Sequence, residues 1–164
     1  MNTVSNLLDE IKSVLENEVV PGISLYTNGS NADKDAEEMK FFKHDLPLSA
    51  EFRGQENKYF PCLIVRDSGG KIATASEPQI NTVKIYVQIR DTNPDMSGYE
   101  KLIITLDRIR DYFLANGGIR GKYQLVYPIE YKVADDITTP YFLGVLVTRW
   151  TVNRMSWNDI EGFL

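Results

Sequence analysis

Hydrophobic and polar residues alternate strictly between Thr82 and Asp91. Every second residue is aliphatic, and the residues between them are polar or charged. A period of two is typical of a β-strand with one face on a core and the other on water or a partner. The run therefore predicts a long strand with one buried face. Its apolar face holds Val83, Ile85, Val87 and Ile89, and its polar face holds Lys84, Tyr86, Gln88 and Arg90.

The N-terminal segment has the period of an amphipathic helix. Apolar residues recur three and four positions apart from Val4 to about Glu18, and charged residues fill the positions between them. Asn2 or Thr3 can cap the start of this helix, and Pro21-Gly22 ends it. The predicted apolar stripe consists of Val4, Leu7, Leu8, Ile11, Val14 and Leu15.

A second, longer helix is predicted from Gly98 to Asn116. Ser97 and Glu100 have the spacing of a capping box, in which two side chains bond the free amides of the first turn. Gly117-Gly118 suits the left-handed end of a helix. We expect this amphipathic helix to lie across one face of the sheet through Tyr99, Leu102, Ile103, Leu106, Ile109 and Phe113.

Shorter extended runs precede the alternating strand. Phe60 to Arg66 is interpreted as a strand, and the glycine-containing run from Asp67 to Lys71 as a turn. A return strand from Lys71 to Ala75 would complete a hairpin. We also interpret Gly22 to Tyr26 as a short strand, and a further strand is predicted to begin near Leu48.

Two more strands follow the second helix. The first runs from Lys122 to Val133, and Pro128 predicts a bulge or an edge position within it, because proline donates no backbone hydrogen bond. The second, from Tyr141 to Arg154, carries apolar residues on both faces. This pattern indicates a central strand, or a strand whose second face is covered by another subunit. One face of the first run would be lined by Tyr123, Tyr127 and Tyr131.

These elements predict one α+β domain over residues 1–164. It has an N-terminal helix and a mainly antiparallel sheet, with one long amphipathic helix packed on one face. The hydrophobic share of 43% and the charged share of 25% are those of a chain with a core. Residues 28–45 are predicted to be a charged mobile loop. Residues 155–164 form a C-terminal tail, docked either on its own domain or on a neighbour.

The charge and the apolar runs bear on the class of partner. The net charge is −5, and the largest local basic groups are pairs such as Arg108 and Arg110, so we expect no sequence-specific nucleic-acid binding. No run approaches the roughly 20 apolar residues that span a bilayer, and no signal peptide is visible, so we expect no membrane partner. A single cysteine, Cys62, excludes an internal disulfide.

The sequence offers no motif for catalysis, a cofactor or a metal. His44 has no second histidine and no cysteine nearby, and Cys62 lies in a predicted strand, where a thiol acts as a small hydrophobe. The acidic cluster from Asp33 to Glu38 lacks the spacing of an EF-hand. The run from Ser68 to Lys71 lacks the phosphate-loop pattern. We therefore expect no catalytic residue, no cofactor and no metal.

Tyrosine, tryptophan and arginine residues suggest a protein contact instead. Core packing is the first interpretation of such aromatic residues, and a protein–protein surface is the second, because these residue types are enriched there. Base stacking is a weaker third. The candidates for a subunit or tube interface are Tyr86, Arg90, Val145, Val147, Arg149, Trp150, Arg154 and Trp157.

The predicted order of elements is an N-terminal helix, an early hairpin, a long strand, a capped helix and two closing strands. Together with Pro61–Val65, Val83–Asp91, Tyr99–Phe113 and Tyr141–Val152, this order resembles the tail terminator (tail completion) proteins of long-tailed bacteriophages. The resemblance covers most of the chain outside Asn28–Tyr59 and is one of architecture and pattern.

The resemblance implies a structural protein of the virion rather than an enzyme. Subunits of this kind close into a ring, usually a hexamer, that caps the head-proximal end of the tail tube and ends its polymerisation. The implied partners are copies of the chain, the tail tube protein and a neck or head–tail connector protein. Assembly would take place in the host cytoplasm.

Other interpretations remain open. The same features fit another neck or head–tail adaptor protein, or the cap of a phage-tail-like bacteriocin. Ring symmetry and the bound partner would separate these structural proteins. A small enzyme on an α+β scaffold is an alternative of another class, and it requires acids, bases or a metal converging on one pocket.

Overall fold

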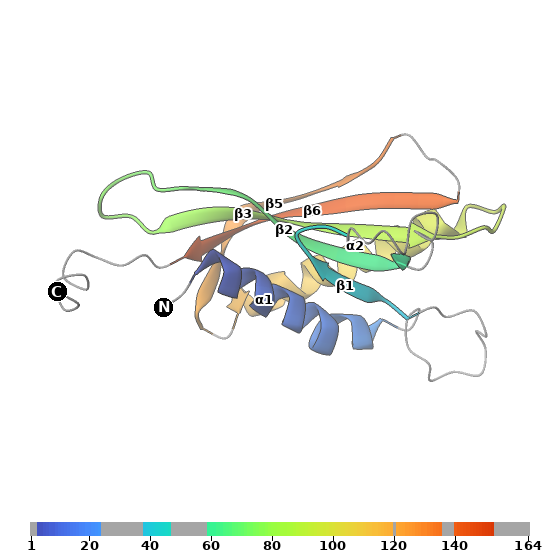
Figure 1. Ribbon diagram of the computed structural model, residues 1–164, viewed down its shortest axis with the longest axis horizontal. Helices are drawn as coiled ribbons and strands as arrows, with labels where there is room; N and C mark the ends of the chain where they lie inside the picture. The colour runs from blue at the N-terminus through green and yellow to red at the C-terminus, as the bar shows by residue number, and fades with distance from the viewer. Residues whose placement is uncertain (1–2, 24–37, 47–58, 120, 136–139, 153–164) are drawn as a thin grey trace.

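Two helices lie on the same face of a six-stranded sheet, so the fold has two layers (Figure 1). The computed structural model describes residues 3–23, 38–46, 59–119, 121–135 and 140–152. The predicted α+β class is correct. The elements are α1 (Val4–Val14), a π-helical turn η1 (Leu15–Val19), a 3₁₀ turn η2 (Val20–Gly22), β1 (Lys40–Lys43), β2 (Cys62–Lys71), β3 (Gln79–Arg90), α2 (Ser97–Asn116), β4 (Gly118–Ile119), β5 (Tyr123–Val133) and β6 (Tyr141–Val152).

The sheet has the strand order β1-β2-β3-β6-β5-β4. Only the β1–β2 pair of the described strands is parallel, and the other pairs are antiparallel. The sheet is therefore mixed and mainly antiparallel. β3 and β6 pair along their full length, from Gln79 opposite Val152 to Arg90 opposite Tyr141. The prediction of a central position for the last strand is confirmed, because β6 lies between β3 and β5.

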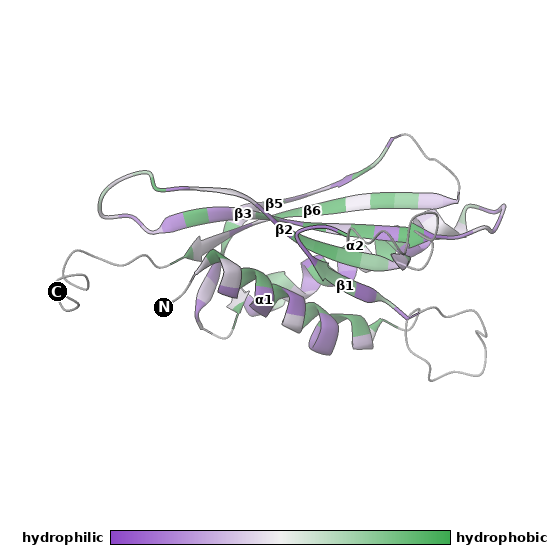
Figure 2. Ribbon diagram, in the orientation of Figure 1, coloured by the Kyte–Doolittle hydropathy of each residue, from purple (hydrophilic) through white to green (hydrophobic). Residues whose placement is uncertain are grey.

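The N-terminal helix begins where the sequence predicts. The Thr3 hydroxyl accepts a hydrogen bond from the Asn6 amide at 3.1 Å, which satisfies one free donor of the first turn. After Val14 the helix widens into η1 and then tightens into η2, which contains Pro21. In Figure 2, hydrophilic and hydrophobic residues alternate around α1, as its amphipathic pattern requires. Its buried residues are Leu7, Leu8, Ile11 and Val14.

Two strand predictions and one loop prediction near the start of the chain need correction or cannot be compared. Gly22 belongs to the 3₁₀ turn rather than to a strand, and residues 24–26 lie outside the described residues. Lys40–Lys43 forms β1, so the prediction of a loop over 28–45 is wrong for these four residues. Residues 28–37, and the strand predicted near Leu48, lie outside the described residues.

The apolar content of β1 explains why it is not a loop. Phe41 packs against the core, and Phe42 meets the ring of Tyr59 edge-on at 5.5 Å between ring centroids. Lys43 forms an ion pair with Asp9 of α1 at 2.8 Å. The strand forms because Phe41 and Phe42, which lie between charged residues in the sequence, both find apolar or aromatic partners in the fold.

The second strand runs further than the sequence suggests. β2 continues to Lys71, with a bulge between Asp67 and Gly70, so the predicted turn over 67–71 and the return strand over 71–75 are wrong. Gly69 takes up the bulge with a φ of 104°, a conformation that glycine adopts without steric cost. The chain turns between β2 and β3 instead, over residues 72–78.

The bulge also has a polar reason. The Asn81 side chain is buried and donates a hydrogen bond to the Asp67 carboxylate at 2.8 Å. A Cβ at Gly70 would lie only 2.5 Å from Oδ1 of Asn81, so the side chain needs a glycine at this position. Gly69 and Gly70 therefore allow a β-bulge within β2, and they do not form a turn that reverses the chain.

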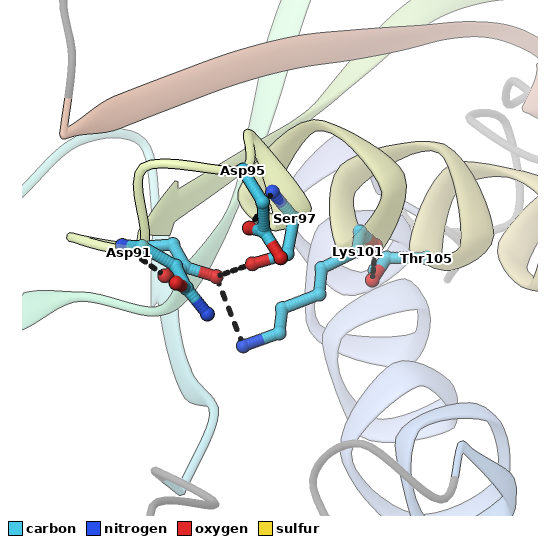
Figure 3. Close-up of polar contacts among 6 residues, drawn as sticks. Asp91, Asp95, Ser97, Lys101 and Thr105 are labelled. Atoms are coloured by element: carbon cyan, nitrogen blue, oxygen red, sulfur yellow. Dashed lines mark hydrogen bonds and ion pairs between the residues drawn. The ribbon is translucent and has the colours of Figure 1, made fainter.

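The second helix is predicted correctly, but its cap is not. Met96 stands at the N-cap with a φ of 63°, and its side chain makes no capping bond. The Ser97 hydroxyl instead donates to the Asp91 carboxylate at 2.7 Å, and Lys101 pairs with the same carboxylate at 3.1 Å (Figure 3). The predicted capping box is therefore wrong, because the Ser97 hydroxyl is bonded to Asp91, the residue after β3, and not to an amide of the first helical turn. Gly117 ends the helix in the left-handed conformation, as predicted.

The core lies between the two helices and the sheet. Trp150 of β6 is fully buried at its centre and meets the Phe113 ring of α2 edge-on at 5.1 Å. The indole N–H donates to the Thr148 hydroxyl at 2.8 Å, so this polar atom is satisfied without solvent. The predicted apolar stripe of α2 needs one correction. Ile103 does not belong to it, since this side chain remains 36% exposed, whereas Thr105, which was not predicted, is fully buried.

The fifth strand has the bulge predicted at Pro128, because its register with β6 shifts between Val126 and Glu130. The predicted tyrosine face is only partly correct. Tyr123 is buried, whereas Tyr127 is 65% and Tyr131 is 51% exposed. β4 pairs only with Tyr123 and Gln124, so the rest of β5 has no described strand on its outer side, and the bulge and this open edge keep the two rings out of the core.

Candidate interaction surface

One face of the sheet carries the two helices, and the opposite face, which we call the outer sheet face, carries none of the described helices. The strand registers assign its residues, because side chains alternate along each strand. It consists of Lys40 and Phe42 of β1, Cys62, Ile64, Arg66 and Lys71 of β2, Ile80, Thr82, Lys84, Tyr86, Gln88 and Arg90 of β3, Val126, Glu130 and Lys132 of β5, and Tyr141, Leu143, Val145, Val147, Arg149 and Thr151 of β6.

The centre of the outer sheet face is apolar. Tyr86 of β3 stands opposite Val145 of β6, and both side chains are half-buried. Leu143, beside them on β6, is 40% exposed. Tyr141 packs its ring against Phe60 at 5.1 Å and is still 36% exposed. Cys62 and Ile64 of β2 are buried, so the exposed apolar part of this face lies over β3 and β6. Exposed apolar and aromatic side chains that are grouped together are typical of a protein–protein contact.

Basic side chains surround this centre. The Arg66 guanidinium stacks over the Tyr86 ring at 5.0 Å, pairs with the Asp45 carboxylate at 3.1 Å and donates to the His44 carbonyl. Arg149 donates to the Pro128 carbonyl at 2.7 Å. These contacts hold two planar guanidinium groups in place, which reduces the side-chain entropy that binding would cost.

The charge of this face is opposite to that of the chain. Among the residues that we assign to it, Glu130 is the acidic one, and it lies 4.0 Å from Arg149. The whole chain has a net charge of −5. The fold thus gathers positive charge on one side of an acidic protein. The cations of the outer sheet face are Lys40, Arg66, Lys71, Lys84, Arg90, Lys132 and Arg149.

Arg90 differs from the other cations. It stands opposite Tyr141 at the end of β3, and its Nε is buried with no hydrogen-bond partner among the described residues. Its neighbour in sequence, Asp91, is engaged by Ser97 and Lys101 on the other side of the sheet. Among the cations of this face, Arg90 therefore carries a buried donor that is left unsatisfied within the described residues.

Five of the eight sequence candidates come together on the outer sheet face: Tyr86, Arg90, Val145, Val147 and Arg149. Val147 is 9% exposed. Trp150 is wrong as an interface residue, because it points to the opposite face and is fully buried in the core. Arg154 and Trp157 lie outside the described residues.

Sequence reasoning missed most of the basic rim. The alternating pattern places Lys84 on the polar face of its strand without indicating the contact, and Arg66 and Lys132 belong to strands that are separated from β3 in the chain. A count of charges on each face of each predicted strand would have found an excess of lysine and arginine. The strand order that unites them was not accessible without the fold.

The reactive groups have ordinary structural positions. Burial raises the pKa of the Cys62 thiol to about 12, even though the Lys40 charge acts in the other direction, so this thiol is neutral at physiological pH. His44 is held with a φ of 75° beside β2. Within the described ranges, no group of three or more His, Cys, Asp or Glu residues could hold a metal ion.

No helix in the described part of the chain is long and apolar enough to cross a bilayer. Comparison of the sequence with protein-family models and with curated proteins found no match to either.

Proposed function

We propose that this chain is a structural protein of a phage tail, similar to a tail terminator. Copies of the chain form a homo-oligomeric ring that caps the tail tube, ends its polymerisation and joins it to the head or neck within the virion. In this function the chain performs no catalysis. The ring is hexameric, like those of the family that the sequence resembles.

The observation that supports this proposal best is the outer sheet face. It offers an apolar centre around Tyr86, Val145 and Leu143, with arginine and lysine at its rim. Its composition is that of a contact surface, in which tyrosine and arginine are enriched. The N-terminal helix, the long strand, α2 and the two closing strands follow one another in the order on which the resemblance rests, whereas the early hairpin in that order is replaced by a β2 that continues to Lys71.

The proposal is tested by adding the purified chain to tube protein during polymerisation and measuring tube length in negative-stain electron micrographs. The expected result is a fall in mean tube length as the ratio of chain to tube protein rises, with the chain bound at one tube end. An unchanged length distribution, with no chain on the tubes, would contradict the proposal. Binding to a neck protein without any effect on tubes would favour an adaptor.

A matched pair of variants connects the outer sheet face to this activity. Val145→Glu places a charge at the centre of the face, and Leu114→Glu places the same charge on an exposed position of α2, where Leu114 is 42% exposed. We expect Val145→Glu to lose tube capping and Leu114→Glu to keep it. Thermal unfolding of both variants controls for a general loss of stability.

A further inference from the structure

The helix layer has an exposed apolar area of its own. A shallow groove of about 490 Å³ on the first half of α2 is lined by Met96, Tyr99, Glu100, Ile103 and Ile104. Met96 is 38% exposed, and Ile103 and Ile104 are each 36% exposed. Large aliphatic side chains that are grouped on one helix face and left in solvent mark a docking site.

The rim of this α2 groove is acidic. Glu100 lines the groove itself, and the Asp95 side chain is exposed next to Met96. Lys101 does not neutralise these carboxylates, because its ammonium group pairs with Asp91 at 3.1 Å (Figure 3). Arg108 is an exposed cation one turn beyond Ile104. The groove thus combines an apolar floor with carboxylates at its N-terminal end.

The α2 groove and the outer sheet face are complementary in hydrophobicity and in charge. Each has an exposed apolar centre, and the rim of one is acidic where the rim of the other is basic. They lie on opposite layers of the molecule, so one copy cannot bring its own two surfaces together (Figure 1). Two copies can do so.

The segregation of charge also selects the symmetry of the contact. If two outer sheet faces met about a two-fold axis, the basic rim of one copy would approach the basic rim of the other, and like charges that meet at an interface cost affinity. A head-to-tail contact, in which different surfaces meet, places unlike charges together instead. Contacts of this kind build rings when the rotation between copies closes, and open filaments when it does not.

We propose that the α2 groove of one copy docks onto the outer sheet face of the next copy, head to tail. Ile103 and Ile104 then cover the apolar centre around Val145 and Leu143, and Glu100 approaches the basic rim that includes Lys84. This contact deepens the proposed function, because it names the surfaces through which the ring would assemble.

The first test is the mass of the wild-type chain in solution at two salt concentrations, measured by light scattering. Association is expected at about 0.05 M salt and should weaken by about tenfold or more at about 0.5 M, because salt screens exposed charges beyond a few ångströms. A chain that stays monomeric at low salt and high concentration overturns the proposal. A symmetric dimer that is insensitive to salt also overturns it.

Charge reversal identifies the surfaces. Lys84→Glu alters only the outer sheet face, and Glu100→Lys alters only the α2 groove; each variant alone is expected to associate about tenfold more weakly than the wild type. When the two variants are mixed, the reversed groove of one matches the reversed face of the other, and the native groove and face meet at the next contact. Recovery of association in the mixture supports the proposal, and failure to recover overturns it.

Controls use the same charge changes elsewhere. Lys12→Glu on α1 and Glu16→Lys on η1 change the net charge by the same amounts at positions outside both surfaces. Both controls are expected to associate like the wild type. If they weaken association as much as Lys84→Glu and Glu100→Lys do, the effect comes from net charge, and the docking contact is overturned.

A nucleic-acid alternative is tested in parallel with fluorescent oligodeoxythymidine. If the wild type remains monomeric and binds the oligonucleotide in a manner that Lys84→Glu abolishes, the outer sheet face is a nucleic-acid surface and the proposal fails. The tube-length assay distinguishes a failure of the docking contact from a failure of the proposed capping function. Wild-type capping without self-association would overturn the contact only, and head-to-tail association without any effect on tubes would overturn the function only.

Discussion

The Asp91 carboxylate joins the end of β3 to the first turn of α2. It accepts hydrogen bonds from the Asn93 amide at 2.9 Å and the Ser97 hydroxyl at 2.7 Å, and its side chain is 10% exposed. Burial acts to raise its pKa, but these hydrogen bonds and the ion pair with Lys101 outweigh burial, so the pKa lies below its ordinary value of 3.8. Asp91 therefore stabilises the fold in its charged form.

Asp91→Asn should lower the free energy of unfolding at neutral pH by about 1–3 kcal/mol, since hydrogen bonds to a charged group are lost. A lowered folded-state pKa means that this stabilisation is fully present above pH 3.8 and disappears as the pH falls through the folded-state pKa. Urea unfolding of wild type and variant, from neutral pH down to below the folded-state pKa, would measure the difference in unfolding free energy. A difference that stays constant down to the lowest pH would show that the carboxylate charge has no part in it.

The contact between α2 and β6 depends on the absence of a side chain at Gly144. A Cβ at this position would lie 2.8 Å from Cδ1 of Leu106 and 3.1 Å from Cδ1 of Leu102. The helix therefore lies close to the strand at this point, and two leucines fill the space above the glycine. Packing of this density tolerates little additional volume.

Gly144→Val should lower the free energy of unfolding by about 1–3 kcal/mol, because overpacking forces the helix or its leucines to move. Val145→Ile adds a methylene at the next residue, which points to the outer sheet face where no described helix lies. That control should unfold within about 0.5 kcal/mol of the wild type, as surface substitutions usually do. Equal losses in the two variants would mean that α2 does not press on β6 at Gly144.

The stability of the whole molecule depends on one buried cluster that includes both helices and the central strands. Trp150 lies at its centre, and its neighbours come from distant parts of the chain. Leu143 lies on the same strand but faces outwards, so the two positions compare the core with the outer sheet face in a single element. Their substitutions should therefore affect different properties.

Trp150→Ala should cost about 3–5 kcal/mol of unfolding free energy, the usual loss for a large aromatic residue removed from a core. Leu143→Ala should cost less than about 1.5 kcal/mol, because this side chain is 40% exposed already. Denaturant unfolding followed by circular dichroism gives both values. If Trp150→Ala unfolds like the wild type, the tryptophan is not a core residue and its assignment to an interface must be reconsidered.

The elements of this chain could be predicted from its sequence where their pattern is local and long. The alternation from Val83 to Ile89 and the helical stripe from Leu102 to Phe113 each repeat over several turns or pleats, so the buried face follows from backbone geometry alone. Predictions failed where a residue outside the helix competes for a group that the local motif would use. Ser97 is the clearest case, because Asp91 takes the hydroxyl that a capping box would use.

By itself, the sequence determined the α+β class, the two helices and the faces of β3, since these depend on the period of nearby residues. Only the tertiary structure decided that β1 pairs with β2, that Trp150 belongs to the core, and that cations from five strands share one face. The physical reason is that strand order and register join residues far apart in the chain, and no local pattern specifies which strands become neighbours. The basic outer sheet face of this acidic protein exists only once β2, β3, β6 and β5 lie side by side.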